Sequence, residues 1–416
     1  MKLVTWGDKR NGGEFTSDRD DFINIFSSQN GKAFAGLTTD GDVVTWGEPN
    51  TFQSNNGENS TDIQHLLKDV ITIAATDSAF AALKQDGSVV AWGNAGSGGS
   101  IPDNIKSQLV RITDIKATKK SFIAINEDKT SFIWGGETFL SNLNTNRLID
   151  IKVLDNQYVI LTEDGFLTNK LDLENQIGER TVQKLYATTD AFAVLLNDGT
   201  LLVSGENTEY ENNNPFDKSK LVNVKKVYTT DRAFFITKRG DQVYGWGNQQ
   251  HGGNIQNVIT RINNIKKVSS TGYAFAILKT DGSVVTWGNQ DFGGNTDNIQ
   301  NQLQKVRDIF ATNDAFTAIK QDGTVITWGN IKNPKIENVF RVFGNQGAFS
   351  ALICNNRVDE CGECDGDGLP KGYCDCDRMI PDIDGTCHPP SYTLYYIITV
   401  VIIAAILFFL YKKYKK

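Results

Sequence analysis

Short stretches in which every second residue is apolar recur along most of the chain. In the clearest copies two such stretches flank an Asp-Gly pair, as in AFAALKQDGSVVAWGN from Ala79, AFAILKTDGSVVTWGN from Ala274 and AFTAIKQDGTVITWGN from Ala315. Alternation with a period of two predicts strands with one buried face. Asp-Gly between two such runs predicts a hairpin with a type I′ turn. The aspartates of these turns then have a structural rather than a catalytic role; they are Asp40, Asp86, Asp164, Asp198, Asp281 and Asp322.

A third apolar stretch precedes the hairpins and ends near an Ala-Thr pair, as in DIKATKK, KLYATTD and DIFATND. Each repeat is therefore predicted to contain at least three strands. A Gly-Gly pair also follows the hairpin in four copies, at Gly12-Gly13, Gly98-Gly99, Gly252-Gly253 and Gly293-Gly294. Glycine pairs at a fixed offset predict a bend where two backbones approach closely.

Tryptophan occurs only inside these repeats, and each one is followed directly by glycine. The seven are Trp6, Trp46, Trp92, Trp134, Trp246, Trp287 and Trp328. Within each run they lie roughly 40 residues apart, a period typical of solenoids, propellers or arrays. We expect their side chains to fill the contacts between neighbouring sheets. Two degenerate copies occupy the interval between Trp134 and Trp246, with Lys170 and Ser204 near the position of the tryptophan.

The two ends of the repeat region are complementary half-repeats. The chain begins with the second half, KLVTWGDKRNGGE, and carries a first half, GAFSALICNN, near residue 350. We therefore expect the first strand to complete the last sheet, which closes the array and leaves only short protected strand edges. Counting hairpins, including the split one, predicts nine repeats. The predicted fold is an all-β, closed β-propeller over residues 1–353.

The repeated text, AF-x-A-L-K-x-DG followed by WG-N and Gly-Gly, resembles the repeat of the regulator of chromosome condensation (RCC1-like) family. It is also similar to the shorter repeats of a bacterial beta-lactamase inhibitor protein. The resemblance covers residues 1–353 and implies a propeller, although the family norm is seven blades. Family functions include guanine-nucleotide exchange on a small GTPase, chromatin docking and inhibitory capping of an enzyme. Each depends on loops outside the repeats, so the resemblance implies the fold and none of these functions.

Charge and residue types narrow the function further. The formal net charge is −7, whereas chromatin docking needs a basic face, so no nucleic-acid partner is expected. The three histidines, His65, His251 and His388, stand in no motif with a nucleophile or a second ligand. The sequence also lacks a Gly-rich phosphate loop, His-Glu-x-x-His and Gly-x-Ser-x-Gly. We therefore expect a non-enzymatic protein with no catalytic residues and no cofactor.

Residues 392–411 read YTLYYIITVVIIAAILFFLY and carry no charge. A helix of this length spans the hydrocarbon core of a bilayer, and its flanking tyrosines suit the membrane interfaces. The sequence therefore predicts a single transmembrane helix that contacts the lipid bilayer. The basic tail, residues 412–416, is expected in the cytosol.

All six cysteines lie between the propeller and this helix, in a module at residues 354–388: Cys354, Cys361, Cys364, Cys374, Cys376 and Cys387. An even, clustered set indicates a disulfide-stapled stalk outside the reducing cytosol. Its text, DECGECDGDGLPKGYCDCD, resembles short modules in the stalks of surface proteins. Zinc held by these paired cysteines is an alternative, but the single residue between Cys374 and Cys376 fits zinc-ribbon spacing poorly.

The stalk module also contains closely spaced aspartates, which are candidate calcium ligands: Asp365, Asp367, Asp375, Asp377, Asp382 and Asp384. Calcium takes oxygen ligands, but no pair continues into a complete EF-hand loop. Solvated acidic residues within a disulfide knot are the interpretation we favour. Asn59, in Asn59-Ser60-Thr61, is a candidate glycosylation site.

Membrane topology decides between the remaining functions. The cysteines and the basic tail predict an extracytosolic propeller, yet Met1 leads straight into the first strand without a hydrophobic signal segment. Insertion through the tail alone would instead leave the propeller in the cytosol. The first hypothesis is a membrane-anchored protein-binding or adhesion module that uses the propeller rim or loops. The second is a tethered regulator, such as a small-GTPase exchange factor or enzyme inhibitor, with a cytosolic propeller. An enzyme with an unrecognised site in the central channel is the third.

Overall fold

The computed structural model describes residues 2–17, 19–27, 30–47, 60–143, 145–205, 210–211, 214–215, 218–354, 359 and 364. The chain divides into two compact units, Met1–Asn355 and Asn356–Lys416. Apart from residues 359 and 364, everything described below belongs to the first unit.

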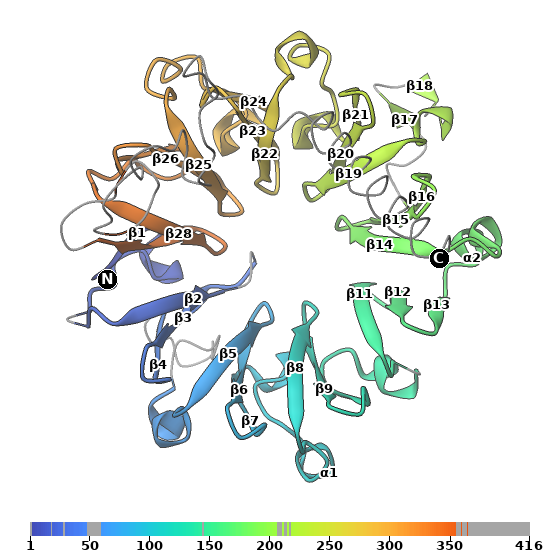
Figure 1. The fold of residues 1–416 in the computed structure, drawn as a ribbon, viewed down its shortest axis with the longest axis vertical. Helices are drawn as coiled ribbons and strands as arrows, with labels where there is room; N and C mark the ends of the chain where they lie inside the picture. Colours follow the sequence, from blue (N-terminus) through green and yellow to red (C-terminus); the bar gives the residue numbers. More distant parts are fainter. Residues whose placement is uncertain are drawn as a thin grey trace, which may run out of the picture. The chain divides into compact units, whose positions relative to one another are not determined.

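The first unit is a ring of nine three-stranded antiparallel sheets (Figure 1). Each sheet is called a blade and is named after its inner strand, the strand nearest the centre of the ring. The inner strands are β2 (Phe22–Phe26), β5 (Val70–Ala75), β8 (Ile112–Ala117), β11 (Leu148–Leu154), β14 (Val182–Ala187), β19 (Val224–Thr229), β22 (Ile265–Ser270), β25 (Val306–Ala311) and β28 (Val339–Gly344). The predicted number of repeats is confirmed.

The middle and outer strands follow in chain order. The middle strands are β3 (Ala33–Thr38), β6 (Ala79–Lys84), β9 (Ser121–Asn126), β12 (Gln157–Thr162), β15 (Ala191–Leu196), β20 (Ala233–Lys238), β23 (Ala274–Lys279), β26 (Ala315–Lys320) and β29 (Ala348–Ile353). The outer strands are β4 (Val43–Gly47), β7 (Val89–Gly93), β10 (Ser131–Gly135), β13 (Gly165–Thr168), β16 (Leu201–Gly205), β21 (Val243–Gly247), β24 (Val284–Gly288), β27 (Val325–Gly329) and β1 (Lys2–Gly7).

The connections between blades contain short helices and strands. They are the α-helices α1 (Asp103–Lys106) and α2 (Leu171–Ile177), the paired strands β17 (Tyr210–Glu211) and β18 (Asn214–Pro215), and the 3-10 helices η1 (Lys9–Asn11), η2 (Thr61–Leu66), η3 (Ala95–Ser97), η4 (Thr138–Asn142), η5 (Lys218–Lys220), η6 (Gln249–His251), η7 (Ile259–Arg261) and η8 (Gln290–Phe292).

The ring closes through a sheet that combines both ends of the repeat region. Strand β1 pairs antiparallel with β29, from Lys2 opposite Ile353 to Gly7 opposite Ala348, and β29 pairs in turn with β28. Trp6 thereby lies opposite Phe349. The predicted closure by complementary half-repeats is confirmed.

Each of the seven tryptophans is buried and packs against an aromatic ring of its own blade. The Phe and Trp residues are directly opposite each other in the middle and outer strands, as Phe275 is to Trp287. The seven pairs have ring centroids 4.9 to 5.4 Å apart. Such pairs contribute about 0.5–1.5 kcal/mol each beyond the apolar area they bury. The same tryptophans lie in clusters that reach the neighbouring blade, as Trp328 does with Ala274 and Leu278.

The Gly-Gly pairs lie where each connection packs against the next blade. Gly98 ends η3 in the left-handed region at φ 90°, and its carbonyl accepts a hydrogen bond of 2.8 Å from Trp134 Nε1 of the following blade. A Cβ on the second glycine, Gly99, would lie 2.3 Å from the carbonyl oxygen of Gly93. The close backbone approach predicted from these pairs is therefore present.

The Asp-Gly hairpins are confirmed, but the predicted type I′ turn is wrong. Gly87 has a positive φ of 79°, whereas Asp86 is not among the residues with positive φ. The Gly87 N–H donates to the Lys84 carbonyl at 2.9 Å, so the loop has three residues and ends in a left-handed glycine. The Asp86 carboxylate accepts from the Ser88 hydroxyl at 2.6 Å and from its N–H at 2.9 Å. These bonds, the hydroxyl bond first, lower the pKa of Asp86, which gives the aspartate a structural role in the turn.

The two degenerate copies form complete blades with substitutes for the tryptophan. Ser204 does occupy its position, opposite Phe192. In the β11 blade the position belongs to Asn169 rather than Lys170, because Val159 pairs with Thr168 and the Tyr158 N–H donates to Asn169 Oδ1. Helix α2 supplies apolar bulk nearby through Leu173 and Ile177, which join a cluster with Phe192.

The loops between inner and middle strands are linked by backbone hydrogen bonds that we call the loop belt. In each bond an N–H of one blade donates to a carbonyl of the next. The bonds are Asp77 to Lys119 at 3.0 Å, Thr189 to Asp231 at 2.7 Å, Asp231 to Gly272 at 3.1 Å, Gly272 to Asn313 at 2.9 Å, Asn313 to Gln346 at 3.2 Å and Gln346 to Gly31 at 3.0 Å. The last bond spans the closure between the β28 and β2 blades.

Within the described residues, no helix is long and apolar enough to cross a membrane. The predicted transmembrane segment, residues 392–411, and the basic tail, residues 412–416, lie outside the described part of the chain.

Candidate functional site

Two of the six candidate cysteines are described. Cys354 and Cys364 are both disulfide-bonded. Cys361, Cys374, Cys376 and Cys387, the six candidate calcium ligands, the glycosylation candidate Asn59 and His388 all lie outside the described residues. Among the residues that are described, no three His, Cys, Asp or Glu side chains come together as metal ligands.

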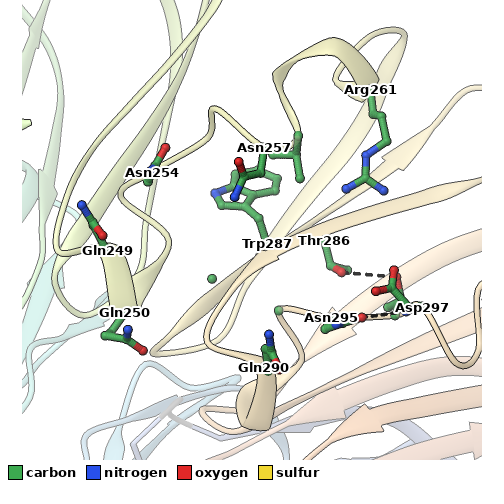
Figure 2. Close-up of a pocket in the computed structure, with 14 residues that line it drawn as sticks. Gln249, Gln250, Asn254, Asn257, Arg261, Thr286, Trp287, Gln290, Asn295 and Asp297 are labelled. Atoms are coloured by element: carbon green, nitrogen blue, oxygen red, sulfur yellow. Dashed lines mark hydrogen bonds between the residues drawn. The ribbon is translucent and has the colours of Figure 1, made fainter. Parts of the chain in front are cut away.

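An amide-rich pocket lies between the connections that follow β21 and β24 (Figure 2). Its volume is about 420 Å³. Side-chain amides surround it, contributed by Gln249, Gln250, Asn254, Asn257, Gln290 and Asn295. Arg261 and Asp297 add one charge of each sign.

Local capping interactions hold the walls of this pocket. Asn248, directly after the Trp246-Gly247 pair, accepts a hydrogen bond from the Gln250 N–H at 2.9 Å and so caps η6. Asn289 caps η8 in the same way by accepting from the Asp291 N–H at 3.0 Å. The Asn295 side chain accepts from the Asp297 N–H at 2.7 Å, as Figure 2 shows. The amide-rich connections are therefore fixed in short turns.

The base of the pocket belongs to the core of the β22 blade. Trp287 is 4% exposed, and its indole N–H donates to the Gly252 carbonyl at 2.9 Å. The hydroxyls of Thr286 and Thr296 lie 3.3 Å apart, and Thr296 donates onward to Gln300 at 2.9 Å. Because these groups are already paired, the base is rigid and the walls carry the groups available to a ligand.

Several wall side chains are exposed and make no hydrogen bond or ion pair within the described structure: Gln250, Asn257, Arg261, Gln290 and Asp297. An amide side chain offers both donors and an acceptor. This combination matches the alternating N–H and C=O groups of a polypeptide, and Arg261 and Asp297 can pair with charged side chains. The arrangement suits recognition of a protein surface.

His251 lies beside this pocket and contacts Gly272 and Tyr273. Its Nδ1 lies 2.8 Å from the Gly272 carbonyl, and its ring stacks on Tyr273 with centroids 4.6 Å apart. Tyr273 stacks in turn on Phe292 at 4.2 Å. These contacts give His251 a packing role.

Two aspartates in the loops between inner and middle strands have a raised pKa. Burial raises the pKa of Asp231, against the opposing effect of His251, Lys119 and Arg232. Burial also raises the pKa of Asp314, and the charge of Asp231 adds to the effect. Both carboxyls are therefore costly to ionise in the folded ring.

The sequence interpretation did not identify the amide-rich pocket. The signal was present in the segments NQQHGGNIQN after Trp246 and NQDFGGNTDNIQN after Trp287, which are dense in Asn and Gln. The glycine pairs in these segments predict a structural bend, whereas the amides around them match no known motif. Two copies at successive blades place these amides opposite each other.

Comparison with known proteins finds no matching family model and no matching curated protein. Similar solved structures include Prp20p from Saccharomyces cerevisiae, at 12% identity and a TM-score of 0.44, over 85% of this chain and 92% of that one. The CRINKLY WD40 ectodomain of the Arabidopsis thaliana receptor kinase ACR4 is 14% identical with a TM-score of 0.38, over 76% and 97%. Human WBSCR16 is 14% identical with a TM-score of 0.39, over 68% and 86%. Similarity at this level concerns the fold alone, and the propeller described above rests on its own strand pairings.

Proposed function

We propose that this chain is a membrane-anchored, non-enzymatic binding protein whose propeller holds a protein partner outside the cytosol. The amide-rich pocket carries the proposal. Its exposed and unpaired side chains stand on connections that are capped at Asn248 and Asn289 and rest on a buried tryptophan. A rigid base with polar walls loses little conformational freedom when a partner binds.

The disulfide-bonded state of Cys354 and Cys364 supports the proposed location. Disulfides persist in oxidising compartments and are rare in the cytosol. The uncharged stretch at residues 392–411 would supply the anchor, with the basic tail at residues 412–416 in the cytosol. A regulator with a cytosolic propeller would require these cysteines to be reduced.

Topology is tested on intact cells that express the full chain. We expect added protease to digest the propeller and thiol-alkylating reagent to leave Cys354 and Cys364 unmodified until a reductant is added. A protected propeller with alkylated cysteines would refute the location and favour the tethered regulator.

Partner binding is tested by cross-linking on the same cells, followed by purification of the chain and mass spectrometry. The pocket variant is Asn257→Lys combined with Gln290→Lys, which fills the pocket with charge. The matched control is Gln85→Lys combined with Asn104→Lys, at exposed amides outside the pocket. We expect a protein cross-linked to the wild-type chain and to the control but lost from the pocket variant. Equal cross-linking to all three chains would refute the role of the pocket.

A further inference from the structure

Every inner strand contains a β-bulge at the same place. The pairing of each inner strand with its middle strand shifts by one residue near the start of the strand. The bulged residues, which we call the bulge ring, are Ile23, Ile71, Thr113, Ile149, Gln183, Lys225, Lys266, Arg307 and Phe340. A bulge leaves its residue unpaired and redirects the side chain.

The bulges surround the centre of the ring on one of its two faces. The inner strands lie nearest the centre in Figure 1. Every inner strand is antiparallel to its middle strand. Each bulge directly follows the first residue pair between them, next to the hairpin that joins the middle strand to the outer strand. Nine bulged residues thus lie around the axis at one rim.

One part of the bulge ring is apolar and exposed. Ile23, Ile71 and Ile149 are 46%, 55% and 48% exposed. These residues come from the β2, β5 and β11 blades, and Thr113 of the β8 blade stands among them. A partner that covered them would gain free energy by removing branched apolar side chains from water.

Another part of the bulge ring is cationic. Lys225, Lys266 and Arg307 come from the consecutive β19, β22 and β25 blades. The Arg307 guanidinium donates to the carbonyls of Val339 and Phe340 at 2.9 and 3.1 Å, so it is held in place against the next blade.

The lysines beside the β19 bulge open onto a hollow of about 250 Å³ between the β19 and β22 blades. Lys225, Lys226 and Lys238 line it and have no carboxylate within ion-pair distance among the described residues. Asp241 is the one carboxylate in the lining, and it makes none of the ion pairs found in the described structure. The hollow therefore presents unneutralised positive charge.

The carboxylates of the inner strands, in contrast, are neutralised in place. Lys116 lies 3.1 Å from Asp114 in β8, and Lys152 lies 2.7 Å from Asp150 in β11. In a chain of net charge −7, the lysines without an ion pair that line this hollow are a local feature. Charge clustered at one rim attracts and orients a partner of opposite sign.

We propose that the bulge ring binds an amphipathic segment of a protein, with carboxylates along one side and apolar residues along the other. The carboxylates pair with Lys225, Lys226 and Lys266, and the apolar side covers the exposed isoleucines. A purely anionic ligand would satisfy the lysines and leave the isoleucines in water, which favours the amphipathic segment. This surface is distinct from the amide-rich pocket, and the proposal rests on the proposed function only in that the partner is a protein.

The test uses the full chain in detergent micelles and a fluorescent synthetic helix with glutamates on one side and leucines on the other. Fluorescence anisotropy measures its affinity. The charge variant is Lys225→Glu with Lys266→Glu, and the apolar variant is Ile71→Ser with Ile149→Ser. The matched control is Lys106→Glu with Lys335→Glu, the same charge change at exposed lysines outside the bulges. Thermal melting checks that each variant is folded.

We expect the charge variant and the apolar variant each to weaken binding about tenfold or more, and the control to weaken it less than about threefold. Raising the salt from about 0.1 M to about 1 M shortens the screening length from roughly 10 Å to roughly 3 Å. The difference between wild type and charge variant should then shrink, while the difference from the apolar variant persists.

The proposal fails if the peptide does not bind, if the control weakens binding as much as the charge variant, or if only the charge variant has an effect. It also fails if a peptide of scrambled sequence, without separate acidic and apolar sides, binds equally well. None of these outcomes depends on the protease, alkylation or cross-linking results, so the two proposals fail independently.

Discussion

Replacing the second glycine of a Gly-Gly pair by alanine should destabilise the ring through backbone overlap alone. At Gly294 an added Cβ would lie 2.4 Å from the carbonyl oxygen and 2.5 Å from the carbonyl carbon of Gly288, whereas ordinary contact begins at 3.4 Å. The backbone must therefore move by about 1 Å, and neither obstructing atom can rotate away. Overpacking of this kind costs about 3 kcal/mol, at the upper end of the usual range.

The expected shift in melting temperature follows from the size of the unit. An unfolding entropy of about 2.1 cal/mol/K per residue, taken over the unit Met1–Asn355, amounts to about 0.7 kcal/mol per degree. The Gly294→Ala variant should therefore melt about 4 °C below the wild type in differential scanning fluorimetry. Because Gly293 accepts the Trp328 indole N–H at 3.1 Å, the tryptophan emission should also shift to the red.

A control separates overlap from the loss of glycine flexibility. Gly240 has a positive φ of 78° and no atom within 4 Å of an added Cβ. Gly240→Ala thus carries only the cost of a left-handed alanine, about 1 kcal/mol or a little more, and should melt only about 1–2 °C lower. If Gly294→Ala melts as high as Gly240→Ala, close backbone approach does not set the requirement for the glycine pair.

Other expected outcomes test the closure, the loop belt and the oxidised cysteines. Trp6→Ala should cost about 3–5 kcal/mol and speed limited proteolysis near Lys2–Gly7, because Trp6 packs in the closing sheet; an unchanged digestion rate would contradict this. Burial raises the pKa of Asp231 in the folded protein above the ordinary 3.8, so folding favours the protonated carboxyl. This contribution to stability is complete below pH 3.8 and is lost as the pH rises through the folded pKa. Asp231→Asn should therefore raise the melting temperature at neutral pH and leave it unchanged at acidic pH; a lower melting temperature at neutral pH would show that the ionised carboxylate is stabilising. Reduction followed by alkylation should label Cys354, whereas alkylation without reduction should not, and mass spectrometry distinguishes the two results.

The ring was predictable because its sequence determinants are periodic. Alternating apolar residues and regular Trp-Gly pairs specify three strands per repeat, and the half-repeat at Lys2–Gly7 specifies the closure. The predictions that were wrong, the turn type and the residue that replaces tryptophan in the β11 blade, concern positions where one residue more or less in a loop changes the result. The turn at Asp86-Gly87 has an extra residue before the aspartate, which changes its type. In the β11 blade the spacing differs by one residue, so Asn169 and not Lys170 replaces the tryptophan.

The candidate binding surfaces were harder to predict because they depend on contacts between repeats. Each amide-rich connection reads as an ordinary loop by itself, and the pocket forms only where two of them face each other. The bulges are marked only by a local break in the alternation, because Val224 and Val227 are separated by two lysines, as are Ile265 and Val268. This break does not by itself show which lysine is unpaired. Only the strand register shows that these lysines are displaced from the ladder.

The loop belt has a consequence for how many blades such a ring contains. Its links use backbone N–H and C=O groups, so they accept residues as different as Asp231, Gly272 and Asn313 at the same position. A duplicated repeat brings its own donor and acceptor and can enter the circle without any matching side chain elsewhere. Blade number can then change by whole units during evolution at the junctions that carry this link. A ring of nine blades is one outcome that such an arrangement permits.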